Sequence, residues 1–200
     1  MNLLGVSFGE GNMKVGDVFS FSLPSRVTCL GASPWCLKHC YAYRYERLRP
    51  SCRRAYRRNL ALTRDPEKFV KTMIGVIPRI LPCFRIHISG DFYSHFYIEA
   101  WERICSEFPQ TKFWAYTRSW AVPELLEPLE QLRALPNVAL FVSTDPTMPL
   151  PPEGWRVAFI ESDPRADGML CTNQNGTQDS CLECGYCFRR DEGNVIFKVH

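Results

Sequence analysis

The chain has 200 residues, which is enough for one ordinary domain or for one domain with a small appendage. Its hydrophobic fraction of 46% and aromatic fraction of 13% support a real core and exclude a largely disordered protein. The first 16 residues lack the basic leader and apolar run of a signal peptide, and no stretch approaches the roughly 20 apolar residues of a membrane helix. We therefore expect a cytoplasmic protein without a membrane partner, in which ten cysteines serve as ligands or core residues more often than as disulfides.

The first third of the chain predicts an arm, a strand, a loop and two helices. Residues 1–16 are polar and glycine-rich, which predicts a loosely attached N-terminal arm. Residues 17–23 alternate apolar and polar side chains in part, which predicts a strand. A cysteine-rich loop follows. Residues 41–64 then have a helical pattern, which Pro50 divides into two helices because proline disrupts a helix interior.

Helices and strands alternate through the rest of the chain. Residues 66–81 place apolar side chains at spacings of three and four, which predicts an amphipathic helix. The later elements are predicted as strands at residues 84–89, 112–117, 138–143, 155–160 and 194–199, and helices at residues 94–108 and 123–135, the second interrupted at Pro128. Such alternation is typical of a parallel sheet. We predict an α/β fold, either a partial (β/α) barrel or an open, mostly parallel sheet, with a core at residues 17–165. Residues 166–200 would form a C-terminal cysteine-rich metal-binding segment packed on that core.

Three cysteines, Cys29, Cys36 and Cys40, lie within 12 residues just after the first predicted strand. Gly31 and Pro34 lie between them and disfavour regular structure, so we expect a loop that can fold back on a metal. Three thiolates without a fourth nearby suit a [4Fe–4S] cluster with one open iron. They suit a structural zinc site less well, because such a site needs four ligands, but zinc is the alternative metal.

A second group of cysteines lies near the C-terminus, at Cys171, Cys181, Cys184 and Cys187. The last three form a CxxCxxC pattern, which is typical of a [4Fe–4S] cluster and also allows a four-thiolate zinc site. The pattern predicts either a second, auxiliary centre or ligands for one centre shared with the first group. The three other cysteines are expected to be bystander or core residues, and these are Cys52, Cys83 and Cys105.

Polar residues follow each predicted strand of the alternating region. The carboxyl ends of parallel strands meet at one edge of a sheet, where ligands bind, so we expect these residues to share a site with the three-cysteine loop. A small-molecule cofactor is the expected ligand. We predict catalytic roles for Asp91, Arg118 and Asp145, and cofactor binding by Ser89, Gly90, Asp91 and Thr117.

The net charge of +3 is unevenly spread along the sequence. Between Lys38 and Arg64 there are nine basic residues and a single acid, Glu46, whereas the rest of the chain is net acidic. Such a block can bind a nucleic acid or an acidic partner protein, or it can be a solvated helix face. The sequence leaves these alternatives open.

Several motifs resemble one known family. They are similar, in order, to motifs of the gene-product-88 family of phage and bacterial proteins, and the resemblance covers nearly the whole chain from about Val18. It implies a phage origin and the bacterial host cytosol as location, without implying an activity. The motifs are FSLPS, TCLGASPWCLKHCYA, RIHISGDFYS, WAYTRSW, CLECGYC and IFKVH.

A weaker similarity is to radical S-adenosylmethionine enzymes. These enzymes place a three-cysteine loop after the first strand of a partial (β/α) barrel and a glycine–acid motif after the second. Gly90 and Asp91 stand in the matching place, so the resemblance implies S-adenosylmethionine as cofactor, with Asp91 holding its amino group. The spacing differs from the CxxxCxxC of those enzymes, because six residues separate Cys29 from Cys36 and three separate Cys36 from Cys40.

Two functions compete at this point. The first is a redox enzyme, radical-SAM-like or of another iron–sulfur type, with an open [4Fe–4S] cluster at the strand ends and an auxiliary cluster near the C-terminus. The alternative is a phage protein that is stapled by metals, zinc included, and binds nucleic acid or a host protein without catalysis. The substrate, the reaction and the oligomeric state do not follow from the sequence.

Overall fold

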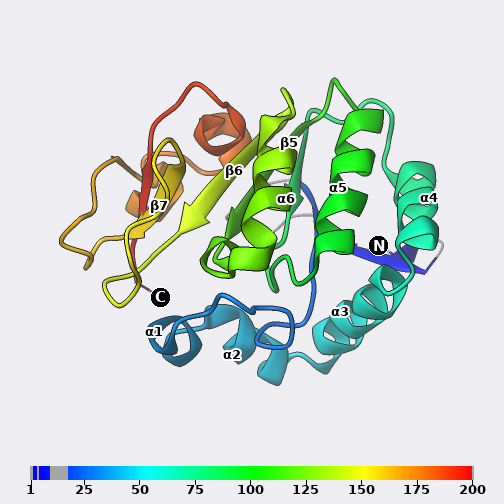
Figure 1. Cartoon of the computed structure of the whole chain (residues 1–200), viewed down its shortest axis with the longest axis horizontal. Coiled ribbons are helices and arrows are strands. Elements are labelled where there is room, and N and C mark those ends of the chain that lie inside the picture. The colour runs from blue at the N-terminus through cyan, green and yellow to red at the C-terminus, as the bar shows by residue number, and fades with distance from the viewer. Residues whose placement is uncertain (1, 4, 10–17, 200) are drawn as a thin grey trace.

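A computed structural model describes residues 2–3, 5–9 and 18–199 of the chain (Figure 1). Within these residues the strands are β1 (Asn2–Leu3), β2 (Val6–Gly9), β3 (Phe19–Phe21), β4 (Cys83–Ile86), β5 (Lys112–Thr117), β6 (Val138–Ser143), β7 (Arg156–Ile160), β8 (Met169–Leu170) and β9 (Val195–Phe197). They form one sheet in the order β1-β2-β3-β4-β5-β6-β7-β9-β8. From β3 onward all neighbours are parallel, whereas β1 and β2 join the edge in antiparallel pairs. The open, mostly parallel α/β sheet is confirmed, and the sheet does not close into the alternative partial barrel.

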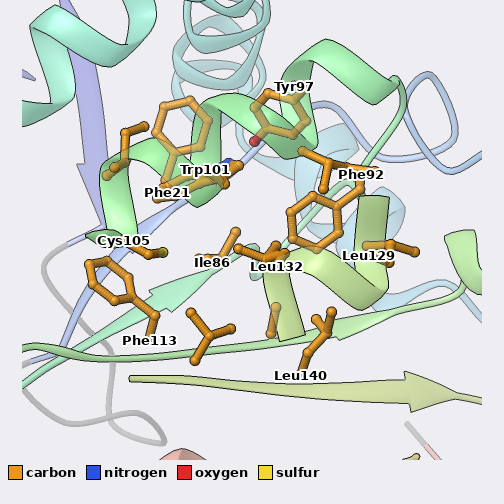
Figure 2. Close-up of a cluster of buried hydrophobic side chains, with 14 of the residues drawn as sticks. Phe21, Ile86, Phe92, Tyr97, Trp101, Cys105, Phe113, Leu129, Leu132 and Leu140 are labelled. Atoms are coloured by element: carbon orange, nitrogen blue, oxygen red, sulfur yellow. The ribbon is translucent and has the colours of Figure 1, made fainter. Parts of the chain in front are cut away.

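Three helices cover one face of this sheet, namely α4 (Pro66–Val76), α5 (His95–Glu107) and α6 (Pro123–Ala134) (Figure 1). Local signals start two of them, because Asp65 accepts a hydrogen bond from the Lys68 amide and Ser94 from the Tyr97 amide. Figure 2 shows apolar side chains of α5 and α6 directed onto the strands. Trp101 of α5 is fully buried, and its ring lies 5.7 Å from that of Phe21 on β3. This layer is the main core of the protein.

The C-terminal segment covers the opposite face of the sheet. It contains α7 (Thr172–Asn175), α8 (Cys181–Cys184) and the 3-10 turn η2 (Tyr186–Phe188). Phe188 packs on Trp114 of β5, with ring centroids 5.4 Å apart. Arg156 of β7 lies 4.1 Å over the ring of Phe141 and donates hydrogen bonds to the Gly193 carbonyl. The sheet is therefore enclosed between a helical layer and an irregular cysteine-rich layer.

Three further helices lie outside the two layers. They are α1 (Pro34–Lys38), α2 (Tyr41–Leu48) and α3 (Pro50–Thr63). Figure 1 shows α1 and α2 beyond the carboxyl ends of the strands, with α3 leading from them toward α4. The predicted division at Pro50 is confirmed, because α3 begins with this proline. In the described part of the chain, no helix is long and apolar enough to cross a membrane.

Some element boundaries differ from those predicted. Helix α4 ends at Val76, two residues before Pro78, rather than at residue 81. Strand β4 ends at Ile86 rather than at residue 89, because His87 adopts a left-handed conformation with φ of 67°. Helix α6 runs through Pro128 without a break, although this proline cannot donate an amide hydrogen bond within the helix.

The predicted N-terminal arm contains two strands of the sheet in its described parts. Val6 on β2 is completely buried, and the Phe8 ring lies 5.9 Å from that of Phe84 on β4. The prediction of a loose arm is therefore wrong for these residues, because it overlooked the apolar pattern of a very short strand. Residues 1, 4 and 10–16, and Asp17 of the predicted first strand, lie outside the described residues.

Asn59 of α3 connects β2 to the rest of the sheet. Its side-chain oxygen accepts from the Ser7 amide, and its side-chain nitrogen donates to the carbonyls of Ser7 and Ser22, all at 2.9 Å. Because Asn59 is fully buried, Asn59→Ala leaves these backbone groups unpaired and is expected to lower the free energy of unfolding by about 2 kcal/mol. Urea denaturation measures this loss, and exchange of the Ser7 amide should accelerate. Gln110→Ala in an exposed turn is the control, and equal stability of the two variants would contradict the assignment.

Candidate functional site

The three-cysteine loop packs directly on the carboxyl ends of β4 and β5. At Gly31 an added Cβ would lie 1.9 Å from the Arg118 carbonyl oxygen, so only glycine permits this approach. Gly90 follows β4 with φ of +80°, and an added Cβ there would lie 2.6 Å from the Leu23 Cβ and 2.7 Å from the Thr28 hydroxyl. Two close approaches at glycines therefore fix the loop backbone over the strand ends.

Asp91 joins the end of β4 to the end of β5. Its Oδ1 accepts hydrogen bonds from the Thr117 hydroxyl at 2.7 Å and the Phe92 amide at 2.8 Å. Its Oδ2 accepts from the Arg118 amide at 2.7 Å, and its own amide donates to the Thr28 hydroxyl at 3.2 Å. Burial raises the pKa of Asp91 to about 6, although the hydrogen bonds from Thr117 and Arg118 favour the charged form. Asp91 is thus held by protein donors on both oxygens.

Asp145, at the end of β6, connects the loop to Arg118. Its Oδ2 accepts from the Ser33 hydroxyl at 2.6 Å and pairs with the Arg118 guanidinium, and its Oδ1 accepts from the Thr147 hydroxyl at 2.6 Å. Burial of the carboxyl opposes its charge, yet the donors from Ser33, Thr147 and Arg118 hold the pKa of Asp145 below its ordinary value. The three predicted catalytic residues therefore lie together, but they bond to one another and to the loop.

Glu46, on α2, likewise connects separate segments through its carboxylate. It is buried, and its Oε1 accepts from the Ser25 amide at 2.8 Å and the Ser89 hydroxyl at 2.9 Å. Ser89, a predicted cofactor ligand, is thus engaged in fastening α2 to the end of β4. The strand-end network is defined here as Ser33, Glu46, Ser89, Asp91, Thr117, Arg118 and Asp145.

Sequence reasoning missed Ser33 and Glu46 as members of this network. Both left a signal in the sequence. Ser33 precedes Pro34, which is a usual cap and first-turn pair, and its hydroxyl does accept from the Cys36 amide at 3.0 Å. Glu46 shares a helix face with Ala42, four residues earlier, and both side chains are buried. A lone acid on the apolar side of an otherwise basic helix indicates an inward-facing partner.

The thiols of Cys29, Cys36 and Cys40 are half-buried, free of disulfides, and close enough to influence one another. Burial raises the pKa of Cys29 to about 12, and the Asp91 carboxylate adds to this shift. Burial also raises the pKa of Cys36, whereas Arg118 favours its thiolate. The Tyr43 amide donates to the Cys40 sulfur at 3.4 Å, and a backbone group of Arg26 hydrogen-bonds Cys29. The loop therefore gathers three sulfur donors of the soft kind that binds iron–sulfur clusters or zinc.

The second cysteine group lines one small pocket on the sheet face opposite the helices. Two one-turn helices shape the segment, each ended by a left-handed glycine, Gly176 with φ of 81° and Gly185 with φ of 68°. Burial raises the pKa of Cys187 to about 12, and its sulfur is hydrogen-bonded to the Tyr116 side chain of β5. The pocket contains all four predicted ligands, which are Cys171, Cys181, Cys184 and Cys187.

The predicted metal ligands thus fall into two groups, one in the three-cysteine loop and one in the C-terminal pocket. Among residues 2–3, 5–9 and 18–199, no set of three or more Cys, His, Asp or Glu side chains is arranged to hold a metal ion as it stands. Metal binding by either group stays a prediction, which the chemistry of the donors fits. Of the other cysteines, Cys83 and Cys105 are buried in the apolar clusters, and Cys52 on α3 belongs to neither group.

Comparison with known proteins places the chain in a family. A family profile described as Gene product 88 matches residues 7–190, a span that includes both cysteine groups. The Gene 88 protein of Mycobacterium phage L5 is 30% identical, with 94% of this chain and 90% of the relative covered. The Gene 88 protein of Mycobacterium phage D29 is 28% identical over the same shares. No solved structure gives a significant match. The chain therefore belongs to the gene product 88 family.

Proposed function

We propose that this protein is an iron–sulfur protein with two centres. The first would be held by Cys29, Cys36 and Cys40 at the carboxyl edge of the sheet, with one position open to a small molecule. The second would be held by the four C-terminal cysteines. The observation that carries the proposal is the docking of the three-cysteine loop, whose backbone is fixed by Gly31 and by the strand-end network while its cysteines form no disulfide.

The strand-end network supports this function as a scaffold. The carboxylates of Asp91 and Asp145 and the Arg118 guanidinium are all bonded within the protein, so their part is to hold the loop in place. A site needs such rigid support, because loosely held ligands bind metals poorly. The half-buried thiols at this edge are soft donors, which select iron–sulfur clusters or zinc over hard metals such as magnesium.

Iron suits the first group better than zinc because three thiolates leave one coordination position for a cofactor or substrate. When bound there, such a cluster supplies an electron and an iron site that accepts a ligand. Radical-SAM-like chemistry is the finer form of this proposal. It is supported by Gly90 and Asp91 next to the loop, although the Asp91 oxygens already accept three hydrogen bonds, so an amino group would have to share Oδ2.

The second centre would stabilise the C-terminal layer. The fully buried apolar residues in its contact with the sheet are few, which leaves much of the stability of this segment to other interactions. In small units with little core, a metal site commonly supplies that stability. Four thiolates complete the coordination, so this centre has a structural or electron-relay role rather than an open site.

Anaerobic reconstitution tests the proposal. With both centres filled, iron and sulfide analysis should give about eight iron atoms per chain. The optical spectrum should show broad absorption at about 400 nm. Cys36→Ala should remove about half of the iron by disabling the first centre, and Cys184→Ala should remove the other half. The control is Cys52→Ser, which lies outside both groups and should keep the full content.

The outcomes separate the alternatives. Zinc in place of iron in protein purified without oxygen would overturn the iron assignment. Iron content that is the same in Cys36→Ala and in the unmodified protein would remove the first centre. For the finer proposal, S-adenosylmethionine and dithionite are added to the loaded protein, and release of 5′-deoxyadenosine that is lost in Cys36→Ala is the expected result.

A further inference from the structure

We propose that the exposed arginines of α2 and α3 form a binding surface for single-stranded nucleic acid. This inference does not depend on the metal centres. The arginine surface is defined as Arg44, Arg47, Arg49, Arg53, Arg54, Arg57 and Arg64, all of which are exposed. Those on α3 fall on one helix face by their spacing, opposite the buried residues Asn59 and Thr63.

Within the described residues, no ion pair offsets the charge of this surface. Glu46, the one acid among these residues, is buried and bonded inward to Ser25 and Ser89. In the part of the chain that the structure describes, none of the seven arginines is in an ion pair. An uncompensated row of guanidinium groups attracts polyanions, and its planar forks match phosphate oxygens.

The stability of α3 does not explain the arginines. Arg53 and Arg57 are four residues apart, as are Arg54 and Arg58, and such like-charged pairs destabilise a helix. Arg53 also lies in the first turn of α3, where the helix dipole favours acids, and this turn contains none. The arginine charges therefore lower the stability of α3, the helix on which they lie. Their presence indicates a ligand rather than a solvated face.

Aromatic rings accompany the arginines and favour unpaired bases as the ligand. Arg49 lies 4.6 Å over the Tyr45 ring, and Arg26 lies 3.6 Å over the Tyr43 ring. Tyr45 is 42% exposed, and Leu48, next to it on the helix, is 81% exposed. Six of the eleven large apolar side chains exposed in the described residues lie between Val27 and Leu48. Bases stack on such rings while arginines track the backbone, whereas an acidic protein would use the charges without the rings.

The surface begins at the three-cysteine loop. Cys40 caps the first turn of α2 through its sulfur, and the helices that carry the arginines, α2 and α3, follow from there (Figure 1). A strand bound to this surface would therefore pass beside the three thiols. Electrostatic attraction and base stacking would act together over α2, and attraction alone over α3.

Fluorescence anisotropy with a labelled 20-nucleotide strand of mixed sequence, as DNA and as RNA, tests the proposal. Binding should weaken with salt, and the slope of log affinity on log salt should be about −3 if roughly four phosphates are contacted. Arg53→Gln combined with Arg57→Gln should weaken binding about tenfold and make the slope shallower by about 1.4. Tyr45→Ala should weaken binding about fivefold or more with an unchanged slope, because it removes stacking.

The matched control is Lys71→Gln combined with Lys112→Gln, which removes two exposed charges elsewhere and should leave binding nearly unchanged. Circular dichroism establishes that each variant is folded. No binding by the unmodified protein, or equal binding by the two double variants, would overturn the proposal. Tighter binding to the matching duplex, or to polyglutamate, would also overturn it, the latter in favour of an acidic protein partner.

Discussion

Gly31→Ala is expected to displace the three-cysteine loop from the sheet and to lower the free energy of unfolding by about 3 kcal/mol. The added Cβ would lie 1.9 Å from the carbonyl oxygen and 2.5 Å from the carbonyl carbon of Arg118, and 3.0 Å from the Ser119 amide nitrogen. All three are backbone atoms, so no side-chain rotation relieves the clash. The loop must move, and with it the bond from Ser33 to Asp145. The midpoint temperature of thermal unfolding should fall by roughly 6–12 °C for a chain of this size.

Gly75→Ala is the matched control for this substitution. Gly75 lies within α4, and an added Cβ would meet no atom within 4 Å. Alanine in a helix is expected to raise stability by about 0.5–1 kcal/mol relative to glycine. If Gly31→Ala unfolded at the same temperature as the unmodified protein, the close contact between the loop and β5 would be wrong. Gly31→Ala should also lose the iron of the first centre while keeping that of the second.

Asp145→Ala is expected to lower the free energy of unfolding by about 3–5 kcal/mol, because it leaves the Arg118 guanidinium buried without its partner. Asp145 has no exposed surface, and the Arg118 side chain is only 10% exposed. The substitution also removes the acceptor for the hydroxyls of Ser33 and Thr147. Chemical denaturation measures the loss, and the loop should become open to proteolysis.

Two further variants show whether the buried pair is responsible. Glu67→Ala breaks an ion pair with Arg103 in which both side chains are at least half exposed, and it should destabilise the protein far less than Asp145→Ala. Arg118→Met together with Asp145→Ala should cost less than the sum of the two single changes, because neither charge is left alone. Additive losses, or a loss in Asp145→Ala no larger than in Glu67→Ala, would contradict the proposed role of the pair.

The stabilisation by Asp145 should depend on pH. Because the pKa of Asp145 in the folded protein is below its ordinary value, the folded state binds a proton less readily than the unfolded state. This contribution is present at neutral pH, and it is lost as pH falls below the ordinary carboxyl pKa of about 3.9. The difference in stability between Asp145→Ala and the unmodified protein should therefore shrink in acid.

Local sequence patterns determined most of the elements. Strands β5 and β6 have the predicted bounds, because runs of apolar and β-branched residues between turn residues specify a buried strand without help from distant parts of the chain. The helices that follow Asp65 and Ser94 start with hydrogen bonds between residues only three positions apart in the sequence. The alternation of these elements was sufficient to predict the parallel sheet and the edge at which the polar strand ends meet.

Only the tertiary structure decided what those polar ends do. Asp91, Arg118 and Asp145 have the composition of a ligand site, yet they bond to one another and to the loop. The deciding contact joins Ser33 to Asp145 across 112 positions of sequence. The same holds for Glu46, for the joining of β2 to the sheet and for the C-terminal layer. Such contacts arise from how packed elements approach one another, and burial then requires each polar group to find a partner that no local pattern specifies.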